Sequence, residues 1–419
     1  MTVQSVQTAS ALGAEAIGRI SDHLDEPDWL RALRAGWWER ASTTPPPTGQ
    51  EEEWRRTSLD ALPREAELLL DVPQLEVDLP HGATEAGVIL TDLRTAVHEH
   101  PDLVERWLGQ ADGPGSHAHF WALAHAAWTG GLFCHVPRGV TVDGTLVARQ
   151  TLPRADVAFH PVSLVLADED SSVTLLEEIV SPDGGAGWYG GIAEVQAGRG
   201  ANVRYASLQQ LGDGAWRVGA ERVVVGQDAV VTTLNAEVGS KVTKLGLDVL
   251  MTGKGGTSKV LGLLAAGDDQ QIDINTVQDL AADHTTSDLL YLSALYDRAH
   301  ASFYGITNVR HGTRQTSSYQ ECRNLLLSPH AGAEPIPVLE IEANDILRCG
   351  HGATAGAIDP TMLFYAQSRG LDPHSAERMI VRGFFEQVVA KIEDETIRER
   401  VLAALARRIG SSSEQEEAA

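Results

Sequence analysis

The sequence predicts a mainly β protein whose central body is a β-solenoid, with α-helical regions before and after it. From Gly130-Gly131 onward, short β-branched and apolar runs are interrupted by Gly, Asp or Asn about every ten to fifteen residues. This pattern continues for roughly two hundred residues without a helical pattern, and 40 glycines against 18 prolines indicate many tight turns. A sandwich, a barrel and a propeller fit the same pattern, but the similar length of the blocks favours a solenoid.

The individual strands follow from β-branched runs and from alternation of apolar and polar residues. Residues 272–275 and 339–342 alternate strictly, which places one face in a core and the other in water. The runs expected to form successive strands are 223–225, 229–234, 245–251, 259–264 and 271–277.

The N-terminal region has helical spacing. Leu24, Trp29, Leu33 and Trp37 recur near the period of a helix and predict a helical hairpin, which ends at a Pro-rich linker at 43–49. Further helical patterns cover 93–108 and 118–128. We expect a helical region at 1–115, a β-helix core at 116–350, a helical region at 351–410 and a disordered tail at 411–419.

Two amphipathic helices are predicted near the C-terminus. Asp359-Pro360 and Asp372-Pro373 are N-cap and first-turn pairs, and apolar residues then recur along one helical face. These apolar stripes can pack on each other, pack on the β body, or form a docking platform for a partner. The candidate partner-binding residues are Ile380, Phe384, Val388, Val401 and Leu405.

Composition limits the function classes. The chain has 419 residues, 33 basic and 58 acidic, and its net charge of −25 disfavours binding to nucleic acid or anionic lipid. It contains no apolar run long enough for a membrane span, and its first twenty residues do not look like a signal peptide. Three scattered cysteines do not form a disulfide framework, so we expect a cytoplasmic protein.

Common catalytic motifs do not occur. Residues 251–259 (MTGKGGTSK) look like a phosphate-binding loop, but the first Gly of that motif and the Ser or Thr after Lys are absent. We expect a β-turn there and no ATP site. The chain also lacks paired CxxC, HExxH and GxSxG motifs, which predicts a non-catalytic protein whose ATPase, if any, is a partner.

One polar cluster is a candidate metal site. Cys349 and His351 are two residues apart, so on extended chain their side chains point the same way, and thiolate and imidazole are both good iron ligands. The flanking glycines allow another backbone or a metal to approach closely. The alternative is that Cys349 is an inert small apolar residue and His351 an ordinary polar one.

Several segments in order resemble the SufB/SufD family of iron-sulfur cluster assembly proteins, more closely its SufD branch. The supporting segments are Trp54-Arg55-Arg56-Thr57, 120–123, 130–140, 284–290, 324–328, 337–341, Cys349-Gly350-His351-Gly352-Ala353-Thr354, 363–365 and 368–370. The family's Ser or Thr between Cys and His is Gly350 here.

The resemblance implies a right-handed parallel β-helix with helical flanks and a role as a non-catalytic scaffold. It implies a SufB-like partner bound through the β-helix, a SufC-like ABC ATPase on the C-terminal helices, and a transient iron-sulfur cluster or iron at the SufB interface. His351 falls on the family's functional histidine and Cys349 on the accompanying cysteine. Arg348 is the neighbour that could favour a Cys349 thiolate.

Three alternatives stay open. The chain could be a SufB-like paralogue that works as a homodimeric scaffold, although its few cysteines argue against this. It could be a β-solenoid enzyme acting on acidic polysaccharide through Asp268, Asp269 and Asp273, although its negative charge would repel that substrate. It could also be an inert structural adaptor.

Overall fold

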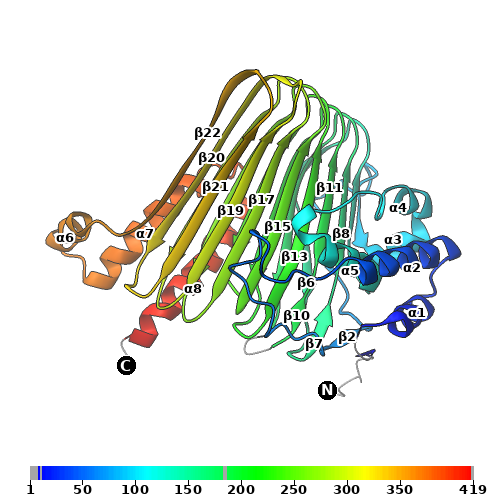
Figure 1. Ribbon diagram of the computed structural model, residues 1–419, viewed down its shortest axis with the longest axis horizontal. Helices are drawn as coiled ribbons and strands as arrows, with labels where there is room; N and C mark the ends of the chain where they lie inside the picture. The colour runs from blue at the N-terminus through cyan, green and yellow to red at the C-terminus, as the bar shows by residue number, and fades with distance from the viewer. Residues whose placement is uncertain (1–7, 10–11, 183–185, 417–419) are drawn as a thin grey trace.

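The computed structural model describes residues 8–9, 12–182 and 186–416 and is a β-solenoid of about eight turns with helices at both ends (Figure 1). Each turn contributes one strand to each of two parallel sheets, which enclose a filled bore. The prediction of a solenoid rather than a sandwich, barrel or propeller is confirmed.

The first sheet, sheet A, contains β5 (Gly131–Val136), β7 (Val157–Phe159), β8 (Val162–Ala167), β10 (Trp188–Tyr189), β11 (Ile192–Ala197), β13 (Trp216–Val225), β15 (Val242–Met251), β17 (Gln271–Leu280), β19 (His300–Val309) and β21 (Gly332–Ile341). The second sheet, sheet B, contains β6 (Thr141–Thr151), β9 (Ser172–Val180), β12 (Asn202–Gln210), β14 (Val230–Glu237), β16 (Thr257–Ala266), β18 (Thr286–Leu295), β20 (Arg314–Leu326) and β22 (Asp345–Ala357).

The Gly and Asp residues that separate the strand runs form a stacked column of turns. Asp170, Gly200, Asp228, Gly255 and His284 adopt the left-handed conformation at the same corner of successive turns. The backbone N–H of each donates to a carbonyl in the next turn, as Asp228 does to Lys254 at 2.9 Å. Gly and Asp tolerate positive φ better than most residues, which explains why they recur between the strand runs.

The N-terminal region covers the outer face of sheet A. Its elements are β1 (Thr8–Ala9), α1 (Ala14–His23), α2 (Asp28–Thr43), β2 (Glu67–Leu69), β3 (Glu76–Asp78), β4 (Ile89–Asp92), α3 (Leu93–Glu99), α4 (Pro101–Trp107), η1 (Gly115–His117) and α5 (Ala118–Ala127). The helical hairpin is present as α1 and α2. Residues 8–9, expected to be helical, form β1 instead, and residues 1–7 and 10–11 lie outside the described residues.

Residues of the Trp54-Arg55-Arg56-Thr57 segment hold this region on the solenoid. The Thr57 hydroxyl donates to Asp273 at 2.6 Å, and Asp273 pairs with the fully buried Lys244 at 2.8 Å. The Lys244 ammonium also lies 4.9 Å from the Trp54 ring centroid. The Thr57 hydroxyl, the Asp273 carboxylate and the Lys244 ammonium are therefore partnered where the N-terminal region meets sheet A, as burial requires.

The C-terminal helices are α6 (Pro360–Ser368), α7 (Pro373–Val389) and α8 (Glu395–Glu416). The side chains of Asp359 and Asp372 accept hydrogen bonds from backbone N–H groups of the first turn of α6 and α7, as the sequence predicts. Helices α7 and α8 pack on the outer face of sheet B, on the side opposite the N-terminal helices (Figure 1). Among the described residues, no helix is long and apolar enough to cross a membrane.

Two segments differ from the expected organisation. Strand β22 continues to Ala357, so 351–357 extend sheet B instead of beginning the C-terminal helical region. Residues 411–416, expected in a disordered tail, belong to α8, and 417–419 lie outside the described residues. The division of the chain into separate domains stays a prediction.

Candidate functional site

Cys349 and His351 lie on β22, the last strand of sheet B. Within the described part of the chain, strand β22 pairs with β20 alone, in parallel register, with Ser318 opposite Cys349 and Gln320 opposite His351. Ser318 and Gln320 are buried and belong to the face that lines the bore. Because a parallel ladder keeps side chains of one row on the same face, Cys349 and His351 also occupy bore-lining positions.

These two residues are accessible because the solenoid ends there. Strands β21 and β22 have no further strand beyond them among the described residues, whereas β3 and β4 pair with β6 and β5 at the other end. His351 is exposed and Cys349 is half-buried. The pair therefore lies at the open end of the bore, on positions that would be covered if another rung followed.

The surroundings of Cys349 do not favour its thiolate. Partial burial raises the pKa of the Cys349 thiol above its usual value. Arg348 does not lower the pKa of this thiol, because adjacent strand residues point to opposite faces of the sheet. The Arg348 guanidinium instead lies 4.4 Å from the Tyr319 ring centroid and 3.6 Å from Asp288. The expectation that Arg348 favours the thiolate is therefore not supported by the geometry.

Gln320 is a site residue that sequence reasoning missed. Its side chain is fully buried in the row next to His351, yet neither its Oε1 nor its Nε2 has a hydrogen-bond partner among the described residues. Gly305 on the opposite sheet makes room for this amide, because a Cβ at 305 would lie 2.4 Å from the Gln320 Nε2. The signal available in the sequence was the repeat that aligns Tyr319-Gln320 with Gly350-His351.

The other cysteines and the histidine of the 284–290 segment do not join this pair. Burial raises the pKa of Cys134 and Cys322 to about 12, and both are core residues of the bore. His284 is the left-handed residue of a turn. No group of three or more His, Cys, Asp or Glu side chains is placed to hold a metal ion within the described residues.

The three aspartates considered for a polysaccharide-cleaving site have different surroundings. Asp273 is buried under the N-terminal region and paired with Lys244. Asp269 pairs with Arg298 at 2.6 Å on the surface, and Asp268 is the left-handed residue of a turn. A paired general acid and base at these positions is therefore not supported.

Most of the predicted partner-binding residues are buried inside the chain. Val388, Val401 and Leu405 are at most 2% exposed and pack with apolar residues on the outer face of sheet B, while Ile380 and Phe384 are partly buried. Of the three arrangements that the sequence leaves open for the apolar stripes of the C-terminal helices, the structure shows packing on the β body. Their role in binding a partner stays a prediction.

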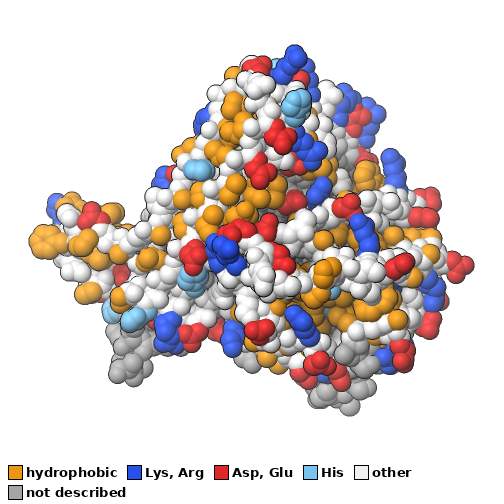
Figure 2. Space-filling view, viewed as in Figure 1, with side chains coloured by type: hydrophobic (Ala, Val, Ile, Leu, Met, Phe, Trp, Pro, Cys, Tyr) orange, Lys and Arg blue, Asp and Glu red, His pale blue; other side chains and the backbone are white. Residues whose placement is uncertain are grey.

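The large exposed apolar residues of the C-terminal region lie elsewhere. On α6, Phe364 is 71% exposed, Tyr365 60% and Met362 53%. Figure 2 shows apolar side chains gathered on the projection that α6 forms in Figure 1. Helix α6 packs on α7.

Comparison with known proteins gives a consistent result. Residues 150–384 match the family described as "SUF system FeS cluster assembly, SufBD core domain". The chain is 28% identical to the iron-sulfur cluster assembly protein SufD of Bacillus subtilis, over 96% of this chain and 99% of that protein. It is 29% identical to an iron-sulfur cluster assembly SufBD family protein of Mycobacterium tuberculosis, over 64% of this chain and 66% of that protein.

Proposed function

Since this chain belongs to the SufBD family of iron-sulfur cluster assembly proteins, we propose that it is the SufD-like scaffold subunit of a complex with a SufB-like chain and a SufC-like ATPase. The nascent cluster or its iron is the cargo of this complex, held near Cys349 and His351 at the SufB interface. The observation that carries the proposal is the placement of this pair at the open end of the solenoid.

The open end supports a partner that completes the site. Edge strands carry unpaired backbone N–H and C=O groups, which another chain can pair with by adding strands. Apolar residues are exposed on both terminal strands, Leu347 on β22 at 66% and Ile341 on β21 at 43%. A SufB-like chain that docks here would cover these residues and bring its own side chains to the cargo.

The chemistry of the pair suits binding of iron as cargo. Tetrahedral iron in such clusters takes four ligands, and Cys349 and His351 provide two, so sulfide or the partner supplies the others. Because Arg348 lies on the opposite face and partial burial raises the pKa of the Cys349 thiol, His351 is the stronger ligand in the free chain and the thiol ionises when metal is bound.

Gln320 would orient His351 in this site. A metal-bound imidazole usually donates its other N–H to an oxygen acceptor, which fixes the tautomer of the ring. The Gln320 amide carbonyl is such an acceptor in the neighbouring row, and it has no competing partner. Under this proposal, cargo binding gives that buried carbonyl the hydrogen bond it lacks.

The ATPase would dock on the C-terminal region through α6 and the exposed faces of α7. The exposed aromatic residues of α6 provide apolar contact area, and Arg369 stacks on Tyr365 at 5.1 Å. ATP hydrolysis would be supplied by that partner and not by this chain.

The test is coexpression of this chain with SufB-like and SufC-like chains, followed by reconstitution with ferrous iron and sulfide. We expect a stable ternary complex whose iron content and cluster absorbance fall by more than half in His351→Ala. The matched control is His330→Ala, which removes an exposed histidine from a turn and should change neither. Unchanged iron in the His351 variant would remove this residue from the site.

A further inference from the structure

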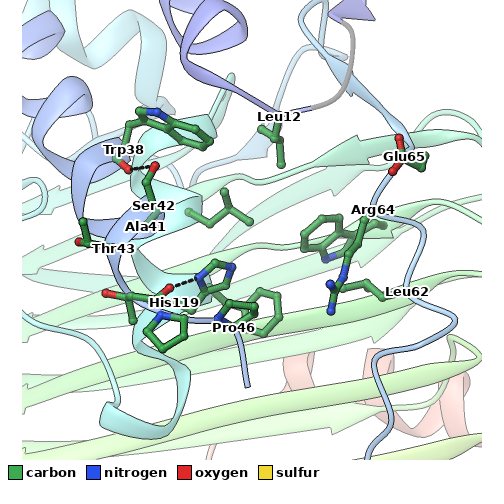
Figure 3. Close-up of a pocket in the computed structure, with 15 residues that line it drawn as sticks. Leu12, Trp38, Ala41, Ser42, Thr43, Pro46, Leu62, Arg64, Glu65 and His119 are labelled. Atoms are coloured by element: carbon green, nitrogen blue, oxygen red, sulfur yellow. Dashed lines mark hydrogen bonds between the residues drawn. The ribbon is translucent and has the colours of Figure 1, made fainter. Parts of the chain in front are cut away.

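A cavity of about 490 Å³ lies between the N-terminal region and the solenoid (Figure 3). It is formed by the end of α2, the Pro-rich linker, the segment around Leu62 and Arg64, and helix α5. This volume lies in the range of small-molecule sites. None of the functions discussed above uses it.

Much of the cavity wall is apolar and aromatic, and its polar members are Ser42, Thr43, Thr44, Arg64, Glu65 and His119. Phe120 and Leu123 come from α5, Ala41 from α2, Leu62 from the following segment and Trp188 from β10. All five are less than 9% exposed, so they form a fixed surface. Such a surface suits the apolar body of a ligand and not a strongly hydrated molecule.

Two groups in the lining are available to an anion. Arg64 is exposed and forms no ion pair with any residue that the structure describes. Trp188 is 3% exposed, and its indole Nε1–H has no acceptor among the described residues. A buried donor without a partner is uncommon, and one in the lining of a cavity indicates a missing acceptor.

His119 contributes to the same side of the cavity. Its ring nitrogen Nδ1 lies 2.8 Å from the Thr44 carbonyl, which can only accept, so Nδ1 carries the hydrogen. Figure 3 shows His119 beside Pro46, with the guanidinium of Arg64 extending from the opposite wall. Burial lowers the pKa of His119, and the Arg64 charge lowers it further to a smaller extent, which agrees with this proximity.

We infer that this cavity binds a small organic anion with an apolar body, whose carboxylate or sulfonate pairs with Arg64 while its body packs on Phe120, Leu123 and Trp188. The Trp188 N–H donates to an oxygen of the ligand. The inference is independent of cluster assembly, because the cavity lies in the N-terminal region and uses no residue of the open end.

The test uses the full chain and two dyes that differ by one charge. Anilinonaphthalene sulfonate has an aromatic body with a sulfonate, and phenylnaphthylamine is its neutral counterpart. We expect the sulfonate dye to bind saturably, one molecule per chain, and at least tenfold more tightly than the neutral dye, which corresponds to about 1.4 kcal/mol.

Substitutions identify the site. Arg64→Ala should weaken sulfonate binding at least tenfold and leave the neutral dye unchanged. Trp188→Phe removes the indole N–H and part of the ring, so it should weaken binding of the sulfonate dye more than binding of the neutral dye. Arg55→Ala is the matched control, since Arg55 is an exposed arginine of the same region that pairs with Glu52. Equal sulfonate binding by wild type and the Arg64 variant, non-saturable binding, or equal affinity for the two dyes would overturn the inference.

Discussion

Gln320 gives a prediction in which stability and function change in opposite directions. Its side chain is fully buried, and both polar atoms of its amide lack partners among the described residues. Burying an amide without hydrogen bonds costs about 1–3 kcal/mol in proteins. Gln320→Met keeps nearly the same volume and removes that cost, so the free energy of unfolding should rise by about 1–3 kcal/mol.

Gln278 is the matched control in the same bore. It is 1% exposed, but its Nε2 donates to the Ser287 hydroxyl at 2.7 Å and to the Ser287 carbonyl at 3.1 Å. Its Oε1 accepts from the Thr307 hydroxyl at 3.3 Å. Gln278→Met leaves these buried groups unpaired and should lower the free energy of unfolding by at least about 1–3 kcal/mol.

The assay is urea unfolding of both variants and wild type, followed by circular dichroism, with iron content measured on the reconstituted ternary complex. Gln320→Met should unfold at higher urea and bind less iron, because the acceptor that orients His351 is gone. The reasoning would be refuted if Gln320→Met lost as much stability as Gln278→Met. If it gained stability but kept its iron, only the orienting role of Gln320 would be wrong; full iron in His351→Ala would reject the site itself.

Two further predictions concern the free chain. Iodoacetamide should label Cys349 in the native protein, while Cys134 and Cys322 should react only after unfolding, because burial raises the pKa of these two thiols to about 12. Peptide mass spectrometry reports the order of labelling, and equal labelling of all three cysteines would contradict the described burial. Burial raises the pKa of Glu221 from 4.5 to about 7, so the folded state holds more protons than the unfolded state between these pH values. Stability should therefore fall as pH rises from about 4.5 to 7, and Asp248, whose pKa burial raises from 3.8 to about 7, adds to the same fall. Glu221→Gln should reduce the dependence of the urea midpoint on pH over this range, whereas an unaltered slope would assign the proton to another group.

The sequence predicts the solenoid because its signals are local and repeated. Each turn needs residues that tolerate positive φ at the same corner, so Asp228 and Gly255 mark successive turns in the sequence. The alternation of 272–275 places Ile272 and Ile274 in the apolar bore, where both are at most 1% exposed. The expectation that the other face lies in water is wrong, because Asp273 and Asn275 are also buried and Thr57 of the N-terminal region contacts Asp273. The turn residues and the bore face are local signals, whereas the covering of the polar face comes from a distant part of the chain.

The second half of the last strand is not predicted by the sequence because it lacks both signals. Strand β22 is an edge strand with no rung beyond it among the described residues, so its bore-facing residues need not be apolar, and residues 352–357 are mostly small. Without alternation, 351–357 resemble a loop. The same absence of a following rung among the described residues makes His351 accessible, so the residues of the proposed site lie on the strand that is hardest to place from sequence.

The amphipathic helices show a second limit. The spacing of Val388, Val401 and Leu405 predicts burial correctly, but spacing does not reveal whether the covering surface belongs to the same chain. That surface is the outer face of sheet B, whose apolar residues are separated from these helices by tens of residues in sequence. The folded arrangement shows that, of the large exposed apolar side chains described on the C-terminal helices, all but Met379 of α7 lie on α6.

The position of α6 determines how a motion of the ATPase could reach the cargo under the proposed function. Helices α7 and α8 contact several strands of sheet B, and the segment between them adds ion pairs of Glu393 with Arg204 and Lys259. A force on these helices is therefore shared by many rungs. Helix α6 begins at Pro360, directly after β22 ends at Ala357. Strand β22 pairs with β20 and contacts β21 of the same rung, with no further strand beyond it among the described residues. A displacement of α6 would thus act first on the strand that carries His351, which makes the terminal rung the most responsive part of the solenoid.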